Sequence, residues 1–479
     1  MLFYTPEFLA FSILLLGMLG IFHKSEPRKL ILLITSYIFY MWWNPAFILL
    51  IIFSTVVDFL IGGRMSDETN KAKRRLLLIA SISSNIGMLI FFKYAGLFGD
   101  SLLGIMRMMG YEPSWVSLNI ILPVGISFYT FQTMSYTIDI YRKEIKATRS
   151  RIDFALFVAF FPQLVAGPIV RAAVFLPQLD RGIKISCDQT TFFLIMRGLA
   201  KKVLIADNLA IFIDPVFSSP GNWPSVIIWM ATIAFAIQIY CDFSGYSDIA
   251  IGIARILGFT LPRNFNHPYS ARNPSDFWQR WHISLSSWLR DYLYISLGGN
   301  RGSAFATYRN LMLTMLIGGL WHGASWNFVL WGLLHGSLLV IHRLYTRMRK
   351  KANPEWRAGN DWGTYLISLA LMQYFVLLTW IPFRLTGFDA MQVTMRKFVV
   401  FDFNFDLTSI GLGNIAFFST LSLMLIFTVF TIISRRTGHI ENYLGQLSTQ
   451  SAAGVCFVSG IVFYYFWPLS QAPFIYFQF

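Results

Sequence analysis

The chain alternates long apolar runs with short polar stretches. Most of the runs approach the roughly 20 residues that a helix needs to cross a bilayer. A lipid environment leaves helices and closed barrels as the only spanning structures, so the pattern predicts an all-α polytopic membrane protein. No soluble segment of domain size interrupts it, and we expect residues 1–479 to form a single transmembrane domain. The apolar runs are residues 6–22, 30–44, 46–63, 76–97, 225–240, 363–382, 413–433 and 453–467.

Composition and charge agree with a membrane protein. Hydrophobic residues make up 55% of the chain and charged residues only 13%, well below the roughly 25% of a soluble domain. The net charge of +15 gathers in alternate loops, because 23–29, 64–75 and 142–151 are basic whereas 42–45 is uncharged. The positive-inside rule then places these basic loops in the cytoplasm and the N-terminus outside. Orientation and attraction to anionic lipid explain most of the charge, and nucleic acid is not an expected partner.

Several common kinds of chemistry lack their sequence signatures. Cys187, Cys241 and Cys456 are an odd, widely spaced set, so neither a disulfide framework nor a zinc site is expected. The chain contains no G-x-x-x-x-G-K-[ST] loop, no H-E-x-x-H motif and no G-x-S-x-G elbow. Phosphoryl transfer, zinc hydrolysis and a serine-esterase mechanism are therefore disfavoured. We expect no metal and no permanently bound cofactor.

The middle of the chain departs from clean apolar runs. Residues 154–171 contain Pro162, Gly167 and Pro168, which favours a bent or re-entrant segment over an ordinary proline-kinked helix. Residues 191–212 carry four charged side chains in an otherwise apolar run. The helix predicted there must lie near a membrane interface or face the interior of the bundle.

Two aspartates continue the helix predicted at 225–240. Asp242 and Asp248 are six residues apart, so they do not share a helix face. Carboxylates inside a membrane are costly and usually mark a functional site or a buried pair. We expect separate roles, one as a hydrogen-bond hub and the other at an interface, with direct chemistry as the less favoured alternative.

The longest polar insertion is residues 266–302. Asn273 or Ser275 is suited to cap a helix opened by Pro274. An aromatic stripe with spacings of three and four then predicts one helix lying in the membrane interface. His282 lies beside this stripe, and this segment alone favours a packed, hydrogen-bonded role over a catalytic one. The stripe consists of Trp278, Trp281, Leu285, Trp288 and Tyr292.

The most informative run has charges only near its ends. Residues 307–345 number 39, and one helix of that length would extend about 58 Å, against about 30 Å for the hydrocarbon core. The run must therefore fold back, most easily at Gly318, Gly319 and Gly323. This places His322 at a helix break, far from both basic ends.

A histidine at such a break implies a wet cavity around it. Charge is costly there, so His322 is expected to be neutral and able to act as a general base, taking a proton from a hydroxyl that attacks an acyl carbon. The alternative is a histidine that only joins two helices by hydrogen bonds. His335, within the following helix, is expected to be structural. Two function classes remain, a histidine-dependent transfer in a membrane cavity and a proton-linked transporter.

Six blocks of the chain resemble the membrane-bound O-acyltransferase family, within it the bacterial alginate and peptidoglycan O-acetylation branch. The resemblance implies a funnel-like bundle of about eleven to thirteen helices with re-entrant and interfacial pieces. The blocks are LPVGISFYTFQTMSYTIDIYR (122–142), FFPQLVAGPIVR (160–171), IYCDFSGYSDIAIG (239–252), FWQRWHISLSSWLRDYLYISLGGNR (277–301), GGLWHGASWNFVLWGLLHG (318–336) and PFIYFQF (473–479).

The same resemblance implies roles for individual residues. His322 would be the catalytic histidine and His282 the second histidine of the active site. Cys241 stands where related sequences often carry an aromatic residue, which affects the shape of the pocket. Four further residues would line or brace the path between the two faces of the membrane: Trp321, Asn327, Tyr240 and Asp242.

The resemblance also implies a reaction and its partners. The donor would be a cytoplasmic thioester, here acetyl-CoA, and the basic loops would gain a second use in holding its phosphates. The acceptor would be an extracytoplasmic acetyltransferase-like or esterase-like protein or a polysaccharide hydroxyl, as in alginate biosynthesis, at the bacterial cytoplasmic (inner) membrane. Two alternatives stay open: a proton-coupled transporter or exporter using His322 and Asp242, although no repeated halves are visible, and D-alanyl transfer to teichoic acid.

Overall fold

A computed structural model describes residues 1–111, 120–356, 359, 361–403, 414–468 and 474–475. All regular structure within these ranges is helical. The chain forms two compact units, one of residues 1–187 with 249–262 and one of residues 188–248 with 263–479. The expectation of a single transmembrane domain stays a prediction.

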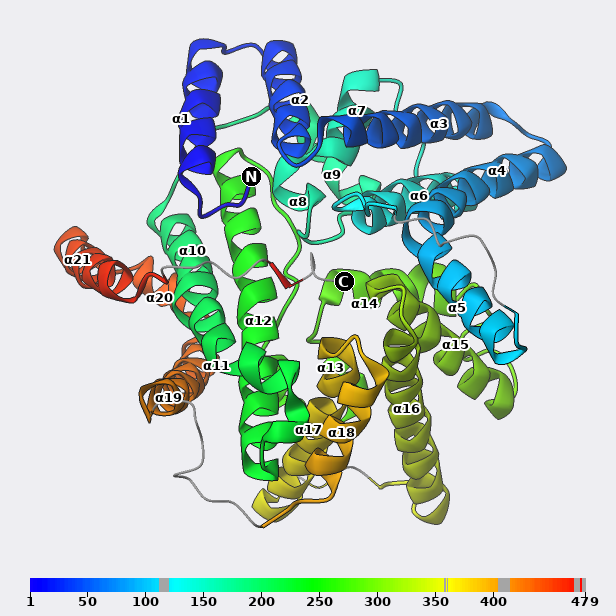
Figure 1. The fold of residues 1–479 in the computed structure, drawn as a ribbon. Helices are drawn as coiled ribbons and strands as arrows, with labels where there is room; N and C mark the ends of the chain where they lie inside the picture. Colours follow the sequence, from blue (N-terminus) through cyan, green and yellow to red (C-terminus); the bar gives the residue numbers. More distant parts are fainter. Residues whose placement is uncertain (112–119, 357–358, 360, 404–413, 469–473, 476–479) are drawn as a thin grey trace. The chain divides into compact units, whose positions relative to one another are not determined.

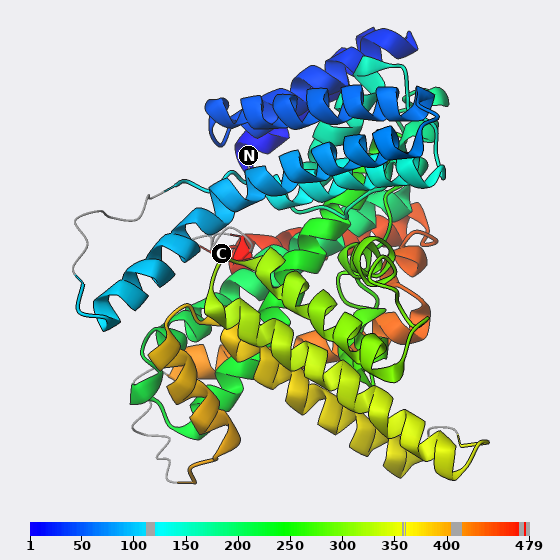
Figure 2. The ribbon, with the colours of Figure 1, turned by 90° about the vertical axis from the view of Figure 1, so that its right-hand side faces the viewer.

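The first unit is a set of mutually packed helices. Within it α3, α4 and α6 contact one another, and α2 contacts α7 (Figures 1 and 2). Its helices are α1 (Pro6–Ile21), α2 (Ser25–Met41), α3 (Ile48–Asp67), α4 (Lys71–Leu89), α5 (Ala95–Met108), α6 (Ile126–Arg142), α7 (Arg151–Ala159), α8 (Phe161–Leu164), α9 (Ala172–Asp180) and the last turns of α12.

The second unit holds most of α12 and a helical hairpin. The hairpin is α15 with α16, and α17 packs against α16 (Figures 1 and 2). The helices are α10 (Gln189–Leu199), α11 (Asp207–Ser218), α12 (Ser225–Ile256), α13 (Pro274–Trp278), α14 (Ile283–Trp288), α15 (Ala304–His322), α16 (Trp326–Ala352), α17 (Trp362–Arg384), α18 (Phe388–Val399), α19 (Asn414–Thr437), α20 (Ile440–Leu444) and α21 (Thr449–Phe466).

Each apolar run predicted from the sequence falls mainly within a helix. Among the described residues, seven helices are long and apolar enough to cross a membrane, and α1 is a shorter apolar helix. The prediction of an all-α polytopic membrane protein is confirmed. The seven candidate spans are Pro45–Asp67, Lys71–Met108, Ser225–Ile256, Trp326–Ala352, Trp362–Arg384, Ala416–Thr437 and Thr449–Phe466.

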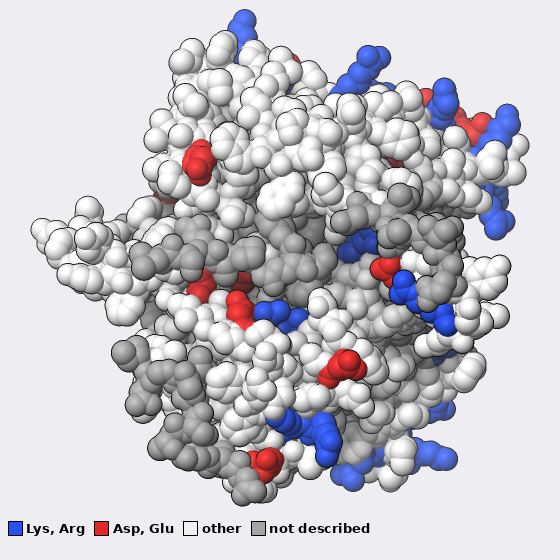
Figure 3. All heavy atoms as spheres, in the orientation of Figure 1, with Lys and Arg blue, Asp and Glu red and all other residues white. Residues whose placement is uncertain are grey.

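The exterior of these helices is apolar. On the described part of the face drawn in Figure 3, lysine, arginine, aspartate and glutamate are sparse, and other residues form most of the surface. A soluble protein rarely exposes contiguous apolar surface on this scale, so the exterior fits contact with lipid chains. More than half of the side chain is exposed at Leu14, Leu371, Leu425 and Phe457, among others.

A buried polar cluster joins α3, α4 and α6. The Asp58 carboxylate accepts hydrogen bonds from Ser81 Oγ at 2.6 Å and from Asn85 Nδ2 at 2.8 Å. Ser81 Oγ also lies 2.9 Å from Thr137 Oγ1. Polar groups buried among apolar helices require partners, so these contacts specify how the three helices pack.

Residues 154–171 are broken, as predicted. α7 ends at Ala159, α8 is a single turn, and no helix continues through 165–171. The backbone passes close to itself here, because a Cβ at Gly125 (φ 75°) would lie 2.6 Å from the Leu164 carbonyl oxygen. Only glycine combines this positive φ with so little space.

Residues 191–212 form one helical run with a change of pitch. A π-helical stretch, Ala200–Ala206, joins α10 to α11. Lys202 and Asp207 are buried in this run. The alternative in which the charges face the protein interior is therefore the one observed.

The expectation of a single interfacial helix within 266–302 is wrong. Asn273 does cap α13, its Oδ1 accepting the Asp276 N–H at 2.9 Å, but α13 ends at Trp278. His282 then adopts φ 43°, a left-handed conformation that a right-handed helix cannot include. Trp281 is 1% exposed. The stripe therefore packs largely inside the protein and does not form one helix, because tertiary contacts outweigh the helical periodicity.

Candidate active site

The predicted break lies between α15 and α16. His322 is the last residue of α15, and Gly323 follows with extended backbone. Ser325 caps α16, its Oγ accepting the Asn327 N–H at 3.2 Å. A side chain at position 323 would overlap the ring of Phe328. The two helices thus form a hairpin with His322 at its turn.

Glycines set the close approach of α15 and α16. A Cβ at Gly332 would lie 2.5 Å from the Met315 carbonyl oxygen and 3.0 Å from Leu316 Cα. A Cβ at Gly336 would lie 2.6 Å from Met312 Sδ. These glycines are four residues apart on one face of α16, the small-residue spacing that lets membrane helices pack closely.

Aromatic rings enclose His322. The imidazole is buried, and its centroid lies 5.0 Å from Trp321, 4.9 Å from Trp331 and 5.1 Å from Phe383, each ring nearly perpendicular to it. These edge-to-face contacts come from α15, α16 and α17 and fix the ring's orientation. His322 therefore has a defined position within the second unit.

Asn327 braces this enclosure. Its Nδ2 donates a hydrogen bond to the carbonyl oxygen of Leu385, the C-cap residue that follows α17. The side chain is buried. The resemblance implied that Asn327 either lines or braces the path between the membrane faces. This hydrogen bond corresponds to the bracing role.

His282 is held by one amide. Its Nδ1 lies 3.1 Å from Asn264 Oδ1, which also accepts the Ser284 N–H at 3.2 Å and the Ser284 hydroxyl at 2.8 Å. A backbone N–H only donates, so the Asn264 atom facing it is the oxygen, and Nδ1 of His282 must carry the hydrogen. This leaves Nε2 as the basic nitrogen. Burial lowers the pKa of His282, which lies outside the candidate spans, to about 3, so the ring is neutral.

Trp321 connects the two histidines. Its ring centroid lies 5.8 Å from that of His282 and 5.0 Å from that of His322. The structure therefore brings together three of the predicted site residues, two from the end of α15 and one from the turn before α14. Their catalytic roles stay predictions.

Tyr240 and Asp242, on α12, have different surroundings. The Tyr240 ring packs 5.7 Å from Phe265, and the Lys201 ammonium lies 5.4 Å from its centroid. Asp242 Oδ2 accepts the N–H of Ile475 at 2.8 Å. Asp242 thus holds Ile475, as a hydrogen-bond hub should. Residues 473 and 476–479 of the PFIYFQF block lie outside the described residues.

A buried ammonium pairs with two carboxylates. Lys202 Nζ lies 2.8 Å from Asp207 Oδ1 and 2.9 Å from Asp242 Oδ1, and all three side chains are buried. The single positive charge of Lys202 therefore lies beside two carboxyl groups, each of which can carry a negative charge. Burial raises the pKa of Asp207, which lies outside the candidate spans, to about 6 despite the nearby Lys202.

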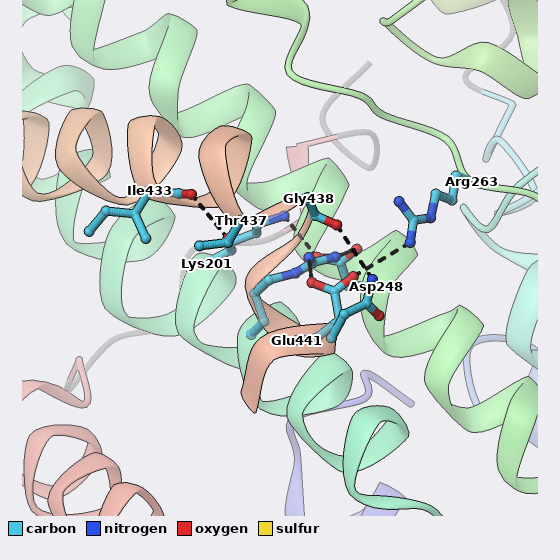
Figure 4. A network of polar contacts seen from close by, with 9 residues as sticks. Lys201, Asp248, Arg263, Ile433, Thr437, Gly438 and Glu441 are labelled. Carbon is cyan, nitrogen blue, oxygen red and sulfur yellow. Dashed lines mark hydrogen bonds and ion pairs between the residues drawn. The ribbon is translucent and has the colours of Figure 1, made fainter. Parts of the chain in front are cut away.

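A second ionic cluster joins α10, α12 and α20 (Figure 4). Arg197 binds Asp248 through two hydrogen bonds of 2.9 and 2.7 Å and also contacts Glu441. Lys201 Nζ lies 2.8 Å from Asp248, and Arg263 lies 3.7 Å from Glu441. Asp248 is therefore a structural ion-pair partner within the second unit.

Sequence reasoning missed three contributors to these arrangements. Asn264 is a single amide in an irregular stretch, and no periodicity marks it. Lys202 was visible as a charge, but its pairing with Asp242 was not, because the two lie 40 residues apart in the sequence. Glu441 follows the apolar run of α19 and gave no signal of a partner. The sequence offered one indication. A charged side chain in an apolar run is costly, so it requires a partner elsewhere in the protein.

Comparisons with known proteins agree on one family. The model of the membrane-bound O-acyltransferase family matches residues 113–379, which include His282 and His322. The probable alginate O-acetylase of Azotobacter vinelandii is 40% identical over 89% of this chain and 84% of its own length. The peptidoglycan O-acetyltransferase of Helicobacter pylori is 33% identical over 100% of this chain and 98% of its own. The teichoic acid D-alanyltransferase of Bacillus subtilis is 27% identical over 55% and 69%.

These matches decide between the two remaining function classes. The family match covers more than half of the chain, and two O-acetylating relatives align with most of it. A transferase is therefore favoured over a proton-linked transporter. The chain belongs to the membrane-bound O-acyltransferase family and is a multi-pass membrane acyltransferase.

Proposed function

We propose that this protein takes an acetyl group from acetyl-CoA at the cytoplasmic side of a bacterial inner membrane and passes it across for O-acetylation of an exported polysaccharide. The observation that carries the proposal is the similarity to O-acetylating relatives along most of the chain. D-alanyl transfer has weaker support, because the D-alanyltransferases are 27–28% identical over about half of the chain. The immediate acceptor is an extracytoplasmic partner protein or the glycan itself.

In the proposed step, an acceptor hydroxyl attacks the acetyl carbonyl carbon while His322 takes its proton. The carbon–oxygen bond forms as the carbon–sulfur bond breaks, and the imidazolium returns the proton to the departing thiolate. The products are an acetyl ester and free coenzyme A, so atoms and charge balance. The aromatic enclosure of His322 supports this role because it holds the base in one orientation.

The charge distribution along α16 supports delivery across the membrane. The helix starts at Trp326, next to the hairpin turn, and ends with Arg349, Lys350 and Lys351 in its last turn. Its 27 residues at 1.5 Å each extend about 40 Å. The positive-inside rule assigns the basic end of α16 to the cytoplasm, so His322 would lie far from that end. The same rule assigns the N-terminus of the chain to the outside.

A transfer assay tests the proposed function. Purified full-length protein in lipid nanodiscs should release free thiol from acetyl-CoA labelled in the acetyl group and place the label on an exported polysaccharide or on a co-purified extracytoplasmic partner. Release from a D-alanyl carrier protein, with none from acetyl-CoA, would replace acetyl transfer by D-alanyl transfer. Absence of transfer from acetyl-CoA to every acceptor offered would overturn the proposal.

Asn264 is expected to act as a positioning residue for His282. In Asn264→Ala the acceptor that fixes the hydrogen on Nδ1 is lost, and we expect kcat to fall roughly tenfold or more with little change in KM, the effect of one lost hydrogen bond. Asn264→Asp keeps an acceptor and should recover part of kcat, with a shifted pH profile. Asn266→Ala, at an exposed neighbouring position, is the control. Equal kcat for Asn264→Ala and wild type would refute this role.

A further inference from the structure

A polar cavity of about 560 Å³ lies in the second unit, apart from the two histidines. Three arginines and one aspartate contribute its charges, and its other lining residues are uncharged. The formal balance of three positive charges against one negative gives +2. A volume of this size is typical of small-molecule sites, and the charge favours an anion.

The arginines are not equivalent. Arg280 is neutralised by Asp276, whose Oδ1 lies 2.6 Å from its Nε. The other two converge on one phenol: Arg272 Cζ lies 5.4 Å from the Tyr365 ring centroid, and Arg435 Nη1 donates to the Tyr365 hydroxyl at 3.3 Å. Both guanidinium groups therefore contact the same lining side chain, where a phosphate would form charge-assisted hydrogen bonds with them.

The cavity lies at the basic, cytoplasmic end expected for α17 and α19. Tyr365 is in the first turn of α17, which follows the basic end of α16, and Arg435 is in the last turn of α19. α17 also links the cavity to the histidines, because Trp380 packs 4.9 Å from Trp281, the neighbour of His282. Residues 365 and 380 are 15 positions apart, which corresponds to about 22 Å of helix.

We propose that this arginine cavity binds the phosphate groups of the nucleotide half of the acyl donor, leaving the pantetheine arm to extend along α17 toward the histidines. The inference rests on the proposed function, since it takes acetyl-CoA as the donor. An anionic lipid headgroup presents the same phosphate chemistry, so the experiment must separate the two sources. Arg272 and Arg435 are assigned as the phosphate-binding residues.

Binding to full-length protein in phosphatidylcholine nanodiscs provides the test. Arg272→Gln and Arg435→Gln are each expected to raise the Kd for acetyl-CoA about tenfold, the loss of one charge-assisted contact. Neither should change the Kd for S-acetylpantetheine, which lacks the nucleotide. Arg436→Gln, the exposed neighbour on α19 that does not line the cavity, is the matched control and should leave both constants unchanged. Unfolding temperatures show whether each variant is folded.

The outcomes separate this inference from the proposed function. If wild-type protein binds acetyl-CoA and both variants bind it equally well, the arginine cavity is not the donor's phosphate site, although the proposed function stands. If the variants lose only affinity for phosphatidylglycerol added to the nanodiscs, the cavity is a lipid site and the inference is wrong. If wild-type protein binds no acetyl-CoA, the proposed donor fails, and the inference fails with it.

Discussion

Replacing His322 by alanine is expected to lower acetyl transfer by roughly 10²- to 10⁴-fold, the usual contribution of a general base. The imidazole is the titratable group at the hairpin turn, buried among Trp321, Trp331 and Phe383. Alanine leaves these rings without a base between them. His322→Gln keeps hydrogen-bonding groups but cannot accept a proton at neutral pH, so it should be impaired to a similar degree. Label transferred from acetyl-CoA measures the effect.

His335→Phe is the matched control for His322. His335 is also a buried histidine of the hairpin, with ring centroids 5.0 Å from Trp278 and 4.6 Å from Trp331. An aromatic replacement preserves these contacts, so activity should remain within a few fold of wild type. A His322→Ala protein that reaches the membrane in normal amount and still transfers acetyl fully would disprove the proposed role of His322.

Replacing Lys202 by methionine is expected to destabilise the protein by about 3–5 kcal/mol, the cost of removing one partner from a buried ion pair. The methionine has a similar length and no charge, so Asp207 and Asp242 would lose the ammonium that lies within 3 Å of each. Both carboxylates would then stay buried without it. Thermal unfolding of the purified protein in detergent, followed by circular dichroism, measures the loss.

A compensating variant separates loss of charge balance from loss of packing. Lys202→Met combined with Asp207→Asn and Asp242→Asn removes all three charges. The amide introduced at position 242 would still offer an oxygen to the Ile475 N–H, so most of the stability should return. Lys201→Met is the matched single control. It should cost less, because Asp248 keeps its two hydrogen bonds with Arg197. Equal losses for Lys201→Met and Lys202→Met would contradict this account.

The helices, the membrane environment and the break at His322 were all predictable from the amino-acid sequence. Long apolar runs leave few alternatives, because lipid forces each spanning segment to satisfy its own backbone hydrogen bonds. A single helix of residues 307–345 would be longer than the bilayer is thick, so this segment must turn. Its glycines indicated where the turn lies. The family followed from blocks of sequence spread over most of the chain.

The pairing of polar side chains, in contrast, became visible only in the folded protein. The stripe from Trp278 to Tyr292 reads as one helix, yet the chain turns at His282, and Trp281 is buried among aromatic neighbours. Asn264 hydrogen-bonds to His282, and Lys202 forms an ion pair with Asp242. The residues of each pair are too far apart in the sequence for a local pattern to predict the contact. The periodicity within a segment indicates which of its faces contacts lipid or protein. The partner of a buried polar group depends instead on which distant segments pack against each other. The complete tertiary fold therefore determines which buried polar groups form pairs.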